Sequence, residues 1–310
     1  MAEPTPAKEK ITFASTLKSS DTEEKFDIIF YRRIGFRIAL FCAALKITPN
    51  AVTIASIFFG IAGGILFYYP ALSTNVIGMF LLVFANSLDS ADGQLARITN
   101  NKSRIGRILD GLAGDSWFVT IHIAICLRSQ NEGWSPFIWV LGSVAGASHI
   151  LQSAMGDYYR NVHLYFIKGR AGSELDNSAH LQVEYDKLTW SRNTVAKFMA
   201  RSYLNYTKLQ ERFTPHLQKL LSAIYKKYPG NDMPETFVQD FRKQNKPLMR
   251  FTNIIQFNTR VMFLFVWLFI NQSWLYFIFD IVVLNAFLVY MMVRQEKVSR
   301  FFYDRISKEQ

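Results

Sequence analysis

Three aspartates in the first half of the chain have the residue type and the spacing of a metal site. Asp89 and Asp92 are three residues apart, which places both carboxylates on one face of a helix. Asp110 follows a short polar stretch and lies about one turn inside the next apolar segment. Two antiparallel helices joined by a loop at 98–105 would therefore bring the three side chains together.

Carboxylates that converge within a membrane repel one another, so they need a compensating partner or a functional reason. A cluster of oxygen ligands without Cys or His favours Mg²⁺, Mn²⁺ or Ca²⁺ over Zn²⁺. Such an ion would neutralise a phosphate diester or a diphosphate, and two ions could stabilise both the attacking and the leaving oxygen. The alternatives are an ion-transport site and a buried polar network.

The elements that must position these aspartates are apolar helices. Half of the residues are hydrophobic, 27 of them Phe, and several apolar runs reach the roughly 20 residues that a transmembrane helix needs. The sequence therefore predicts an all-α polytopic membrane protein with six spans. The predicted spans are 51–69, 74–92, 108–127, 135–155, 252–270 and 274–293.

The other segments are predicted to lie on the membrane or in the cytoplasm. Residues 25–46 place apolar and basic side chains at helical spacing, which indicates a helix on the membrane surface. The predicted organisation is a tail with this surface helix (1–47), spans one to four with the acidic motif (48–155), a cytoplasmic helical insert (156–250), spans five and six (251–294) and a cytoplasmic tail (295–310).

Positive charge predicts the orientation, because short cytoplasmic loops carry the excess of Lys and Arg. Residues 156–250 contain 16 Lys plus Arg against 9 Asp plus Glu, whereas the linkers at 70–73 and 271–273 contain no charge. We expect both termini and the acidic motif to face the cytoplasm from the inner membrane. The net charge of +11 suits anionic membrane lipids, and the chain has no nucleic-acid recognition motif.

Small residues and one cation accompany the aspartates. Gly93, Ala96 and Gly106 remove side-chain bulk where the two helices would face one another, so a flat or bulky group could enter there. Arg97 stands beside them as a fixed cation that suits phosphate oxygens.

The motif resembles that of the CDP-alcohol phosphotransferase family, D-x-x-D-G-x-x-A-R, about eight residues, then G-x-x-x-D-x-x-x-D. Here it reads Asp89-Ser-Ala-Asp92-Gly93-Gln-Leu-Ala96-Arg97, eight residues, then Gly106-Arg-Ile-Leu-Asp110. Seven of the eight family positions are matched.

This resemblance implies a six-helix membrane fold, usually a homodimer, with two divalent ions, Mg²⁺ or Mn²⁺, held by the acidic residues. The family moves a substituted phosphate from a CDP-linked donor to an alcohol and releases CMP. Asp89, Asp92 and Asp110 match the family's metal ligands. The residues that would border the nucleotide or the donor phosphates are Gly93, Ala96, Arg97 and Gly106.

The last family position departs from the pattern. Gly114 stands where the family has its last acid, which serves as general base and helps to bind metal, and Asp115 is one place late. In a regular helix Asp115 lies about 140° from Asp110, unless a π-bulge near Gly111 or Gly114 rotates it back. We expect Asp115 to keep a catalytic or metal role beside Asp110. The alternative is a polar contact to another helix, for example through His149 or the basic insert.

Other polar residues offer weaker candidates. If Asp115 points away, the alternative bases are His122, His149, Asp157 and His163. Further substrate contacts are expected from Arg104, Arg160 and His149. Arg260 and Asp280 lie in the last two predicted spans, and we expect them to pair with each other rather than to bind substrate.

Three functions are consistent with these residues. The first is a phosphotransferase of lipid head-group synthesis that uses a CDP-linked donor. The second is transfer of a phosphoalcohol, such as phosphoinositol, from a phospholipid to a ceramide-type lipid with release of diacylglycerol; the overall shape resembles a bacterial branch associated with inositol or sphingolipid head groups. The third is a membrane protein that binds ions or lipids without catalysis.

Overall fold

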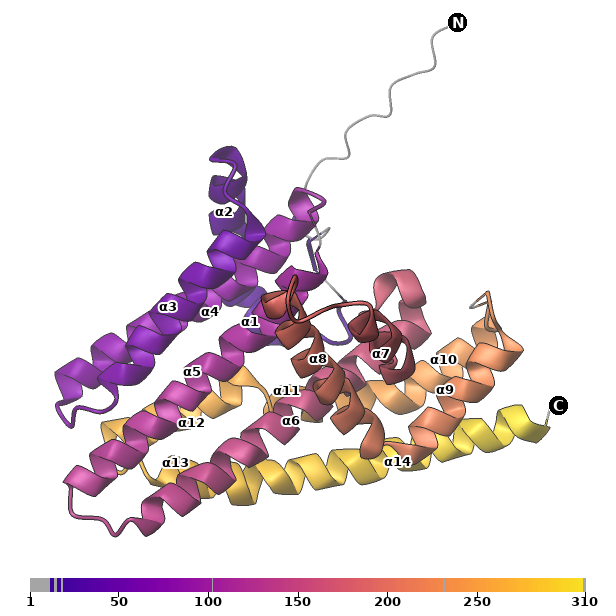
Figure 1. Cartoon of the computed structure of the whole chain (residues 1–310). Coiled ribbons are helices and arrows are strands. Elements are labelled where there is room, and N and C mark those ends of the chain that lie inside the picture. The colour runs from indigo at the N-terminus through magenta and orange to yellow at the C-terminus, as the bar shows by residue number, and fades with distance from the viewer. Residues whose placement is uncertain (1–11, 14–15, 18, 102, 231, 309–310) are drawn as a thin grey trace, which may run out of the picture.

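The computed structural model describes residues 12–13, 16–17, 19–101, 103–230 and 232–308, without the side chains of 104, 105, 107 and 171 (Figure 1). Throughout this part of the chain the regular structure is helical and contains no strand. The predicted all-α class is therefore confirmed.

Five helices are long and apolar enough to cross a membrane. They are α3 (Pro49–Leu66), α4 (Leu72–Ile98), α5 (Arg104–Asn131), α6 (Phe137–Lys168) and a continuous helix made of α13 (Leu275–Ile278), the π-helical turn η4 (Phe279–Leu284) and α14 (Asn285–Lys308). Large apolar side chains on their outer faces are exposed, among them Ile54, Phe58 and Phe80, as expected for helices solvated by lipid.

The predicted fifth span at 252–270 is not one helix. It is divided into α11 (Met249–Ile254) and α12 (Phe257–Phe269) by Gln256, whose backbone is extended. The 13 residues of α12 extend only about 20 Å, so the expected count of six spans is not confirmed. The break places the side chains of Asn253 and Gln256 beside Arg160, which donates a hydrogen bond to each.

The predicted surface helix forms as two helices, α1 (Lys25–Ile29) and α2 (Tyr31–Ala44), and α2 packs on α4. Gly35 permits this approach, because a Cβ there would lie 3.0 Å from the backbone nitrogen of Ala91. That α2 lies in the membrane interface remains a prediction.

The segment after α6 forms a helical insert over the ends of α6 and α14. Its helices are η2 (Arg170–Gly172), α7 (Ser178–Asp186), α8 (Thr194–Arg212), α9 (Pro215–Lys227), α10 (Glu235–Asn245) and η3 (Lys246–Leu248). Leu217 of α9 and Phe241 of α10 pack with Phe166 and Phe302 in a buried core. The insert, α1 and the C-terminal end of α14 lie at the same end of the long helices (Figure 1).

A buried polar network joins the last helices to α6. Arg260 pairs with Asp280 of η4 and donates to the Gln152 side chain at 2.7 Å. All three side chains are fully buried. The prediction that Arg260 and Asp280 pair with each other is therefore confirmed.

Asp21 connects the N-terminal segment to the insert and to α6. Its carboxylate accepts hydrogen bonds from Arg242 at 2.6 Å and Lys246 at 2.9 Å, and His163 lies 3.3 Å away. The Arg242 guanidinium, helped by Lys246, holds the pKa of Asp21 well below its usual value. This contact keeps residues near 21 against α10.

Replacing Gly63 should loosen the packing of α3 on α4. A Cβ at Gly63 would lie 2.8 Å from the carbonyl oxygen of Gly78, and backbone cannot yield as a flexible side chain can. We expect Gly63→Ala to lower the free energy of unfolding by about 1–3 kcal/mol. The matched control is Gly146→Ala in α6, where the nearest atom is 4.0 Å away, and it should be neutral or slightly stabilising. Thermal unfolding in detergent measures both, and equal effects would contradict the expectation.

Replacing Asp21 should destabilise the protein in a pH-dependent way. Because the pKa of Asp21 is lowered on folding, its stabilisation is fully present above its unfolded pKa of about 3.9 and is lost as pH falls further. We expect Asp21→Asn to lower stability by about 1–3 kcal/mol at neutral pH, and the difference from the wild type to shrink below about pH 4.

The control for this substitution is Asp240→Asn, which removes an exposed ion pair with Arg305 and should cost about 1 kcal/mol or less. Thermal unfolding as a function of pH provides the measurement. A difference between the wild type and Asp21→Asn that grows on acidification would show that the interaction has the opposite sign.

Candidate metal and active site

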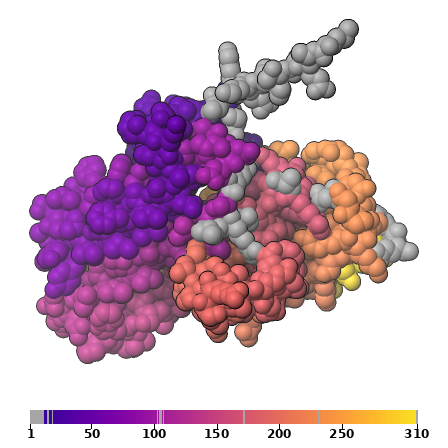
Figure 2. Space-filling model, turned by 45° about the horizontal axis from the view of Figure 1, so that its top comes forward, coloured from indigo at the N-terminus to yellow at the C-terminus, as the bar shows by residue number. Residues whose placement is uncertain are grey.

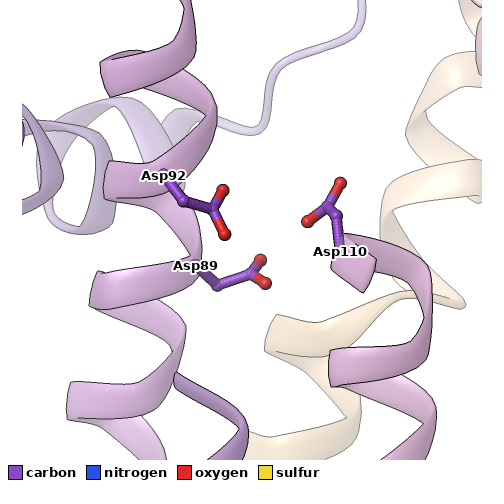
Figure 3. Close-up of side chains that lie close together, drawn as sticks. All are labelled: Asp89, Asp92 and Asp110. Atoms are coloured by element: carbon purple, nitrogen blue, oxygen red, sulfur yellow. The ribbon is translucent and has the colours of Figure 1, made fainter. Parts of the chain in front are cut away.

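Helices α4 and α5 bring Asp89, Asp92 and Asp110 together at one end of the spans. One ligand oxygen from each carboxylate lies within 4.8 Å of the others, and the three groups face a common space (Figure 3). Asp92 is only 5% exposed, Asp89 is half-buried and Asp110 is exposed. We call these three residues the acidic cluster. The cluster is buried at Asp92 and open to solvent at Asp110.

The start of α5 positions Asp110. The Ser103 hydroxyl accepts a hydrogen bond from the Gly106 backbone N–H at 2.9 Å, as in a capped helix N-terminus. The loop between α4 and α5 therefore ends at a defined residue, and Asp110 follows about two turns later. Fixing the first residue of the helix fixes which face Asp110 occupies.

The geometry of the acidic cluster fits a divalent ion. Two ligands on opposite sides of an ion with metal–oxygen distances of about 2.4 Å are about 4.8 Å apart, and the three carboxylate oxygens all lie within 4.8 Å of one another, so one ion can contact all of them. Carboxylates this close repel one another, so they need either a shared proton or a cation between them. The all-oxygen donor set suits Mg²⁺, Mn²⁺ or Ca²⁺.

Thr53 of α3 supports the cluster and was missed by the sequence analysis. Its hydroxyl donates to Asp92 Oδ2 at 2.5 Å, and the residue is buried. A hydrogen bond of this kind fixes the orientation of a ligating carboxylate. The sequence feature that could have indicated Thr53 is its polarity in the second turn of an otherwise apolar span. Spacing along the sequence, however, does not indicate which helix the Thr53 side chain faces.

Arg97 lies beside the acidic cluster and has unused hydrogen-bonding capacity. Its Nε and Nη2 atoms are buried and have no hydrogen-bond partner among the residues described. The guanidinium borders Gly93, where a Cβ would lie 3.7 Å from Nη1 and Nη2, and it interacts electrostatically with Asp110. Unsatisfied buried donors are costly, and an anion with several oxygens would satisfy them.

Gly106 and Ala96 have different surroundings. A Cβ at Gly106 would lie 2.9 Å from Asn50 Oδ1 and 3.0 Å from Ser103 Oγ, so this glycine allows α5 to pack on the first turn of α3. Ala96 is partly buried on α4. The expected contacts of both residues with substrate remain predictions.

Asp115 is not a member of the acidic cluster. Helix α5 is regular from Arg104 to Asn131, so it contains no π-bulge near Gly111 or Gly114 that would rotate Asp115 toward Asp110. Asp115 therefore lies about 140° from Asp110 around the helix, where it interacts electrostatically with Tyr206 of α8.

The histidines lie away from the acidic cluster. The His149 ring is buried 4.3 Å from the ring of Phe118, which is eight residues and about 12 Å further along α5 than Asp110. His122 is buried, and its Nδ1 atom lies 2.6 Å from the Phe118 carbonyl oxygen. His163 contacts Asp21 and Asn245. The structure thus does not bring His149 to the cluster as a substrate contact.

Asp157 and Arg160, two other predicted residues, lie in the half of α6 that leads into the insert. Asp157 lines a polar cavity between α6 and α8 together with Tyr206. Arg160 donates to Asn253 and Gln256, which accounts for one of its nitrogen atoms. The Arg104 side chain lies outside the part of the chain that the structure describes.

Fold and site together define a polytopic helical membrane protein with an acidic site between two of its spans. Residues 46–159 match the family model for CDP-alcohol phosphatidyltransferase. This match covers more than a third of the chain, including the whole acidic cluster. It confirms the family resemblance that the motif predicted, for the segment that it covers.

Curated relatives give the same family relationship over a shorter segment. Proteins of Mycobacterium bovis and Mycobacterium tuberculosis named "Putative cardiolipin synthase" are 37% identical over 70 residues. That segment is 22% of this chain, and the chain spans about a third, 34%, of the length of these relatives. The insert lies almost entirely outside the family match.

Removing the Thr53 hydroxyl should weaken metal binding. Without its hydrogen bond, Asp92 loses the contact that orients its carboxylate, and such supporting contacts are typically worth 10–100-fold in metal affinity. We expect this loss for Thr53→Val, a substitution of similar shape, and near wild-type affinity for Thr53→Ser. Mn²⁺ binding to the protein in lipid nanodiscs, followed by electron paramagnetic resonance, measures the affinity. Equal affinity of both variants would mean that Asp92 needs no such support.

Proposed function

We propose that this chain is an integral membrane phosphotransferase of lipid head-group synthesis, which transfers a substituted phosphate from a CDP-linked donor to an alcohol. The observation that carries this proposal is the convergence of three carboxylates beside Arg97, whose buried nitrogens have no partner among the described residues. A cation-binding site next to an anion-binding side chain suits a phosphate group that reacts at the metal. The family match over 46–159 supports the same class.

Each residue then has a defined task. Asp89, Asp92 and Asp110 hold divalent ions, Mg²⁺ or Mn²⁺ and two in number by family resemblance. Bound ions would neutralise the phosphate oxygens and stabilise the leaving group. Arg97 donates hydrogen bonds to phosphate oxygens, while Gly93 leaves the adjoining space open. We also propose that Ala96 and Gly106 border the donor.

Asp110 is the exposed member of the cluster, so it can accept the proton of an attacking hydroxyl. Asp115 lies on another face of α5, a helix that α8 contacts, and we propose that it contributes to acceptor binding rather than to the metal site. Arg104 and Arg160 remain proposed contacts for phosphate groups, and His149 is too deep along α6 to share this role.

We propose a second candidate reaction, because the chain has a helical insert that lies beyond the family match. Helix α8 packs on α5 near Asp115, where the family's last acid is displaced. In this second reaction a phospholipid donates its phosphoalcohol, such as phosphoinositol, to a ceramide-type lipid. The rest of the phospholipid is released as diacylglycerol. Binding of ions or lipids without catalysis is the remaining alternative.

We propose that the protein resides in the inner membrane, with both termini and the site facing the cytoplasm. The location of the insert, α1 and the end of α14 at the same end of the spans as the site supports this orientation (Figure 1). Membrane lipids are its expected partners. By family resemblance it acts as a homodimer.

Purified protein in lipid vesicles should release CMP when offered CDP-diacylglycerol or CDP-alcohols with Mg²⁺ or Mn²⁺ and an alcohol acceptor. We expect Asp110→Asn to reduce this rate by about 10²–10⁴-fold, because it removes both a ligand and a proton acceptor. Release of diacylglycerol from phosphatidylinositol would instead support the second reaction. No transfer from any donor, with metal binding intact, would contradict both.

Asp115→Asn is the matched control for Asp110→Asn on the same helix. Since Asp115 lies on another face of α5, its substitution should leave Mn²⁺ affinity unchanged and raise the KM of the acceptor. A loss of metal affinity equal to that of Asp110→Asn would place Asp115 in the metal site after all.

A further inference from the structure

Large apolar side chains are exposed where α7 is joined to α8. Trp190 is 45% exposed, Val195 is 72% exposed and Phe198 is 58% exposed. We call these three residues the exposed apolar patch. The α7–α8 region forms part of the molecular surface beside the spans (Figure 2). Apolar groups gathered on an exposed surface indicate an interaction site.

The exposed face of α8 changes character along the helix. Val195 and Phe198 lie in its first half, followed on the same face by Arg201, Asn205 and Lys208, all exposed. The opposite face, with Met199, Leu204 and Thr207, is buried against the protein. The exposed face is thus apolar in the first half of α8 and polar in the second half. Surroundings that are apolar next to Val195 and Phe198 and watery next to Asn205 would match this change in polarity.

The contacts of α8 place it at the edge of the lipid-facing surface. Gln210 donates to the carbonyl oxygen of Ala154 in α6 at 2.9 Å, and Ala154 is one turn beyond the exposed Ile150. Tyr206 interacts with Asp115 of α5, which is one turn before the exposed Val119. Four residues extend about 6 Å along a helix, so the second half of α8 lies near the level where the apolar outer surface of the spans ends. The exposed apolar patch continues from there along the first half of the helix.

Cations surround the exposed apolar patch. Lys187, Arg192 and Arg201 are exposed. Lys197 lies over the ring of Tyr185 at 4.6 Å and over that of Trp190 at 5.8 Å. Trp at the boundary of an apolar layer, flanked by Lys and Arg, is the composition of segments that lie in the interface of an anionic membrane.

We propose that Trp190, Val195 and Phe198 enter the boundary between head groups and acyl chains of an anionic bilayer, and that the neighbouring cations bind the lipid head groups. The polar side chains that follow on the same exposed face, among them Asn205, face the water. The insert is thus held on the membrane at a point separate from the spans, beside the helix that carries Asp110 and Asp115. This attachment does not depend on the proposed phosphotransferase activity.

Fluorescence quenching by bromine atoms on lipid acyl chains tests the proposal. The full chain is reconstituted in vesicles of phosphatidylcholine and phosphatidylglycerol, with brominated or unbrominated acyl chains. Emission of Trp190 is obtained as the difference between the wild type and Trp190→Phe. In the Trp190→Phe background, Phe198→Trp and Asn205→Trp probe two positions on the same exposed face of α8.

We expect blue-shifted emission from Trp at 190 and 198 that is lost in brominated vesicles, and emission at 205 that is quenched by aqueous iodide instead. Replacing phosphatidylglycerol by phosphatidylcholine should reduce the bromine quenching at 190. Bromine-insensitive emission at 190 and 198 would overturn the proposal. If those positions were shielded from iodide as well, a protein contact such as a second copy of this chain would cover the patch.

Discussion

The repulsion among three carboxylates held close together is the constraint on which the rest of the site depends. Asp89, Asp92 and Asp110 converge within 4.8 Å at the end of α4 and α5, where burial weakens screening by water. Two packed helices supply the rigidity that keeps them there. An arrangement of this kind is stable when a cation or a proton is shared, which makes the site receptive to a divalent ion.

Close packing of the first spans makes that convergence possible. Gly63 and Gly78 let α3 and α4 meet backbone to backbone, and this contact brings α3 near enough for Thr53 to bind Asp92. Gly106 allows the start of α5 to approach the start of α3 in the same way. The small residues thus act on the chemistry indirectly, through the distances between helices.

Charged side chains elsewhere in the chain connect helices to one another and do not form a binding site. Arg260 and Asp280 pair with each other inside the last helices, and Asp21 joins the N-terminal segment to α10. Arg97 leaves two buried nitrogens without a hydrogen-bond partner among the described residues, whereas Arg260 leaves only its Nε. Satisfied charges stabilise the fold, whereas unsatisfied donors are available to a ligand.

The sequence by itself determined the helical membrane class, the three clustered aspartates and the pairing of Arg260 with Asp280. Hydrophobic run length and helical spacing are local properties, and they suffice for these predictions. Tertiary structure decided that 252–270 is broken at Gln256, where Arg160 binds the side chains at the break. It also decided that Thr53 supports Asp92, that Asp115 lies outside the acidic cluster, and that part of the insert stays apolar on the outside. Each depends on which faces of separate helices meet, and spacing within one helix does not specify that.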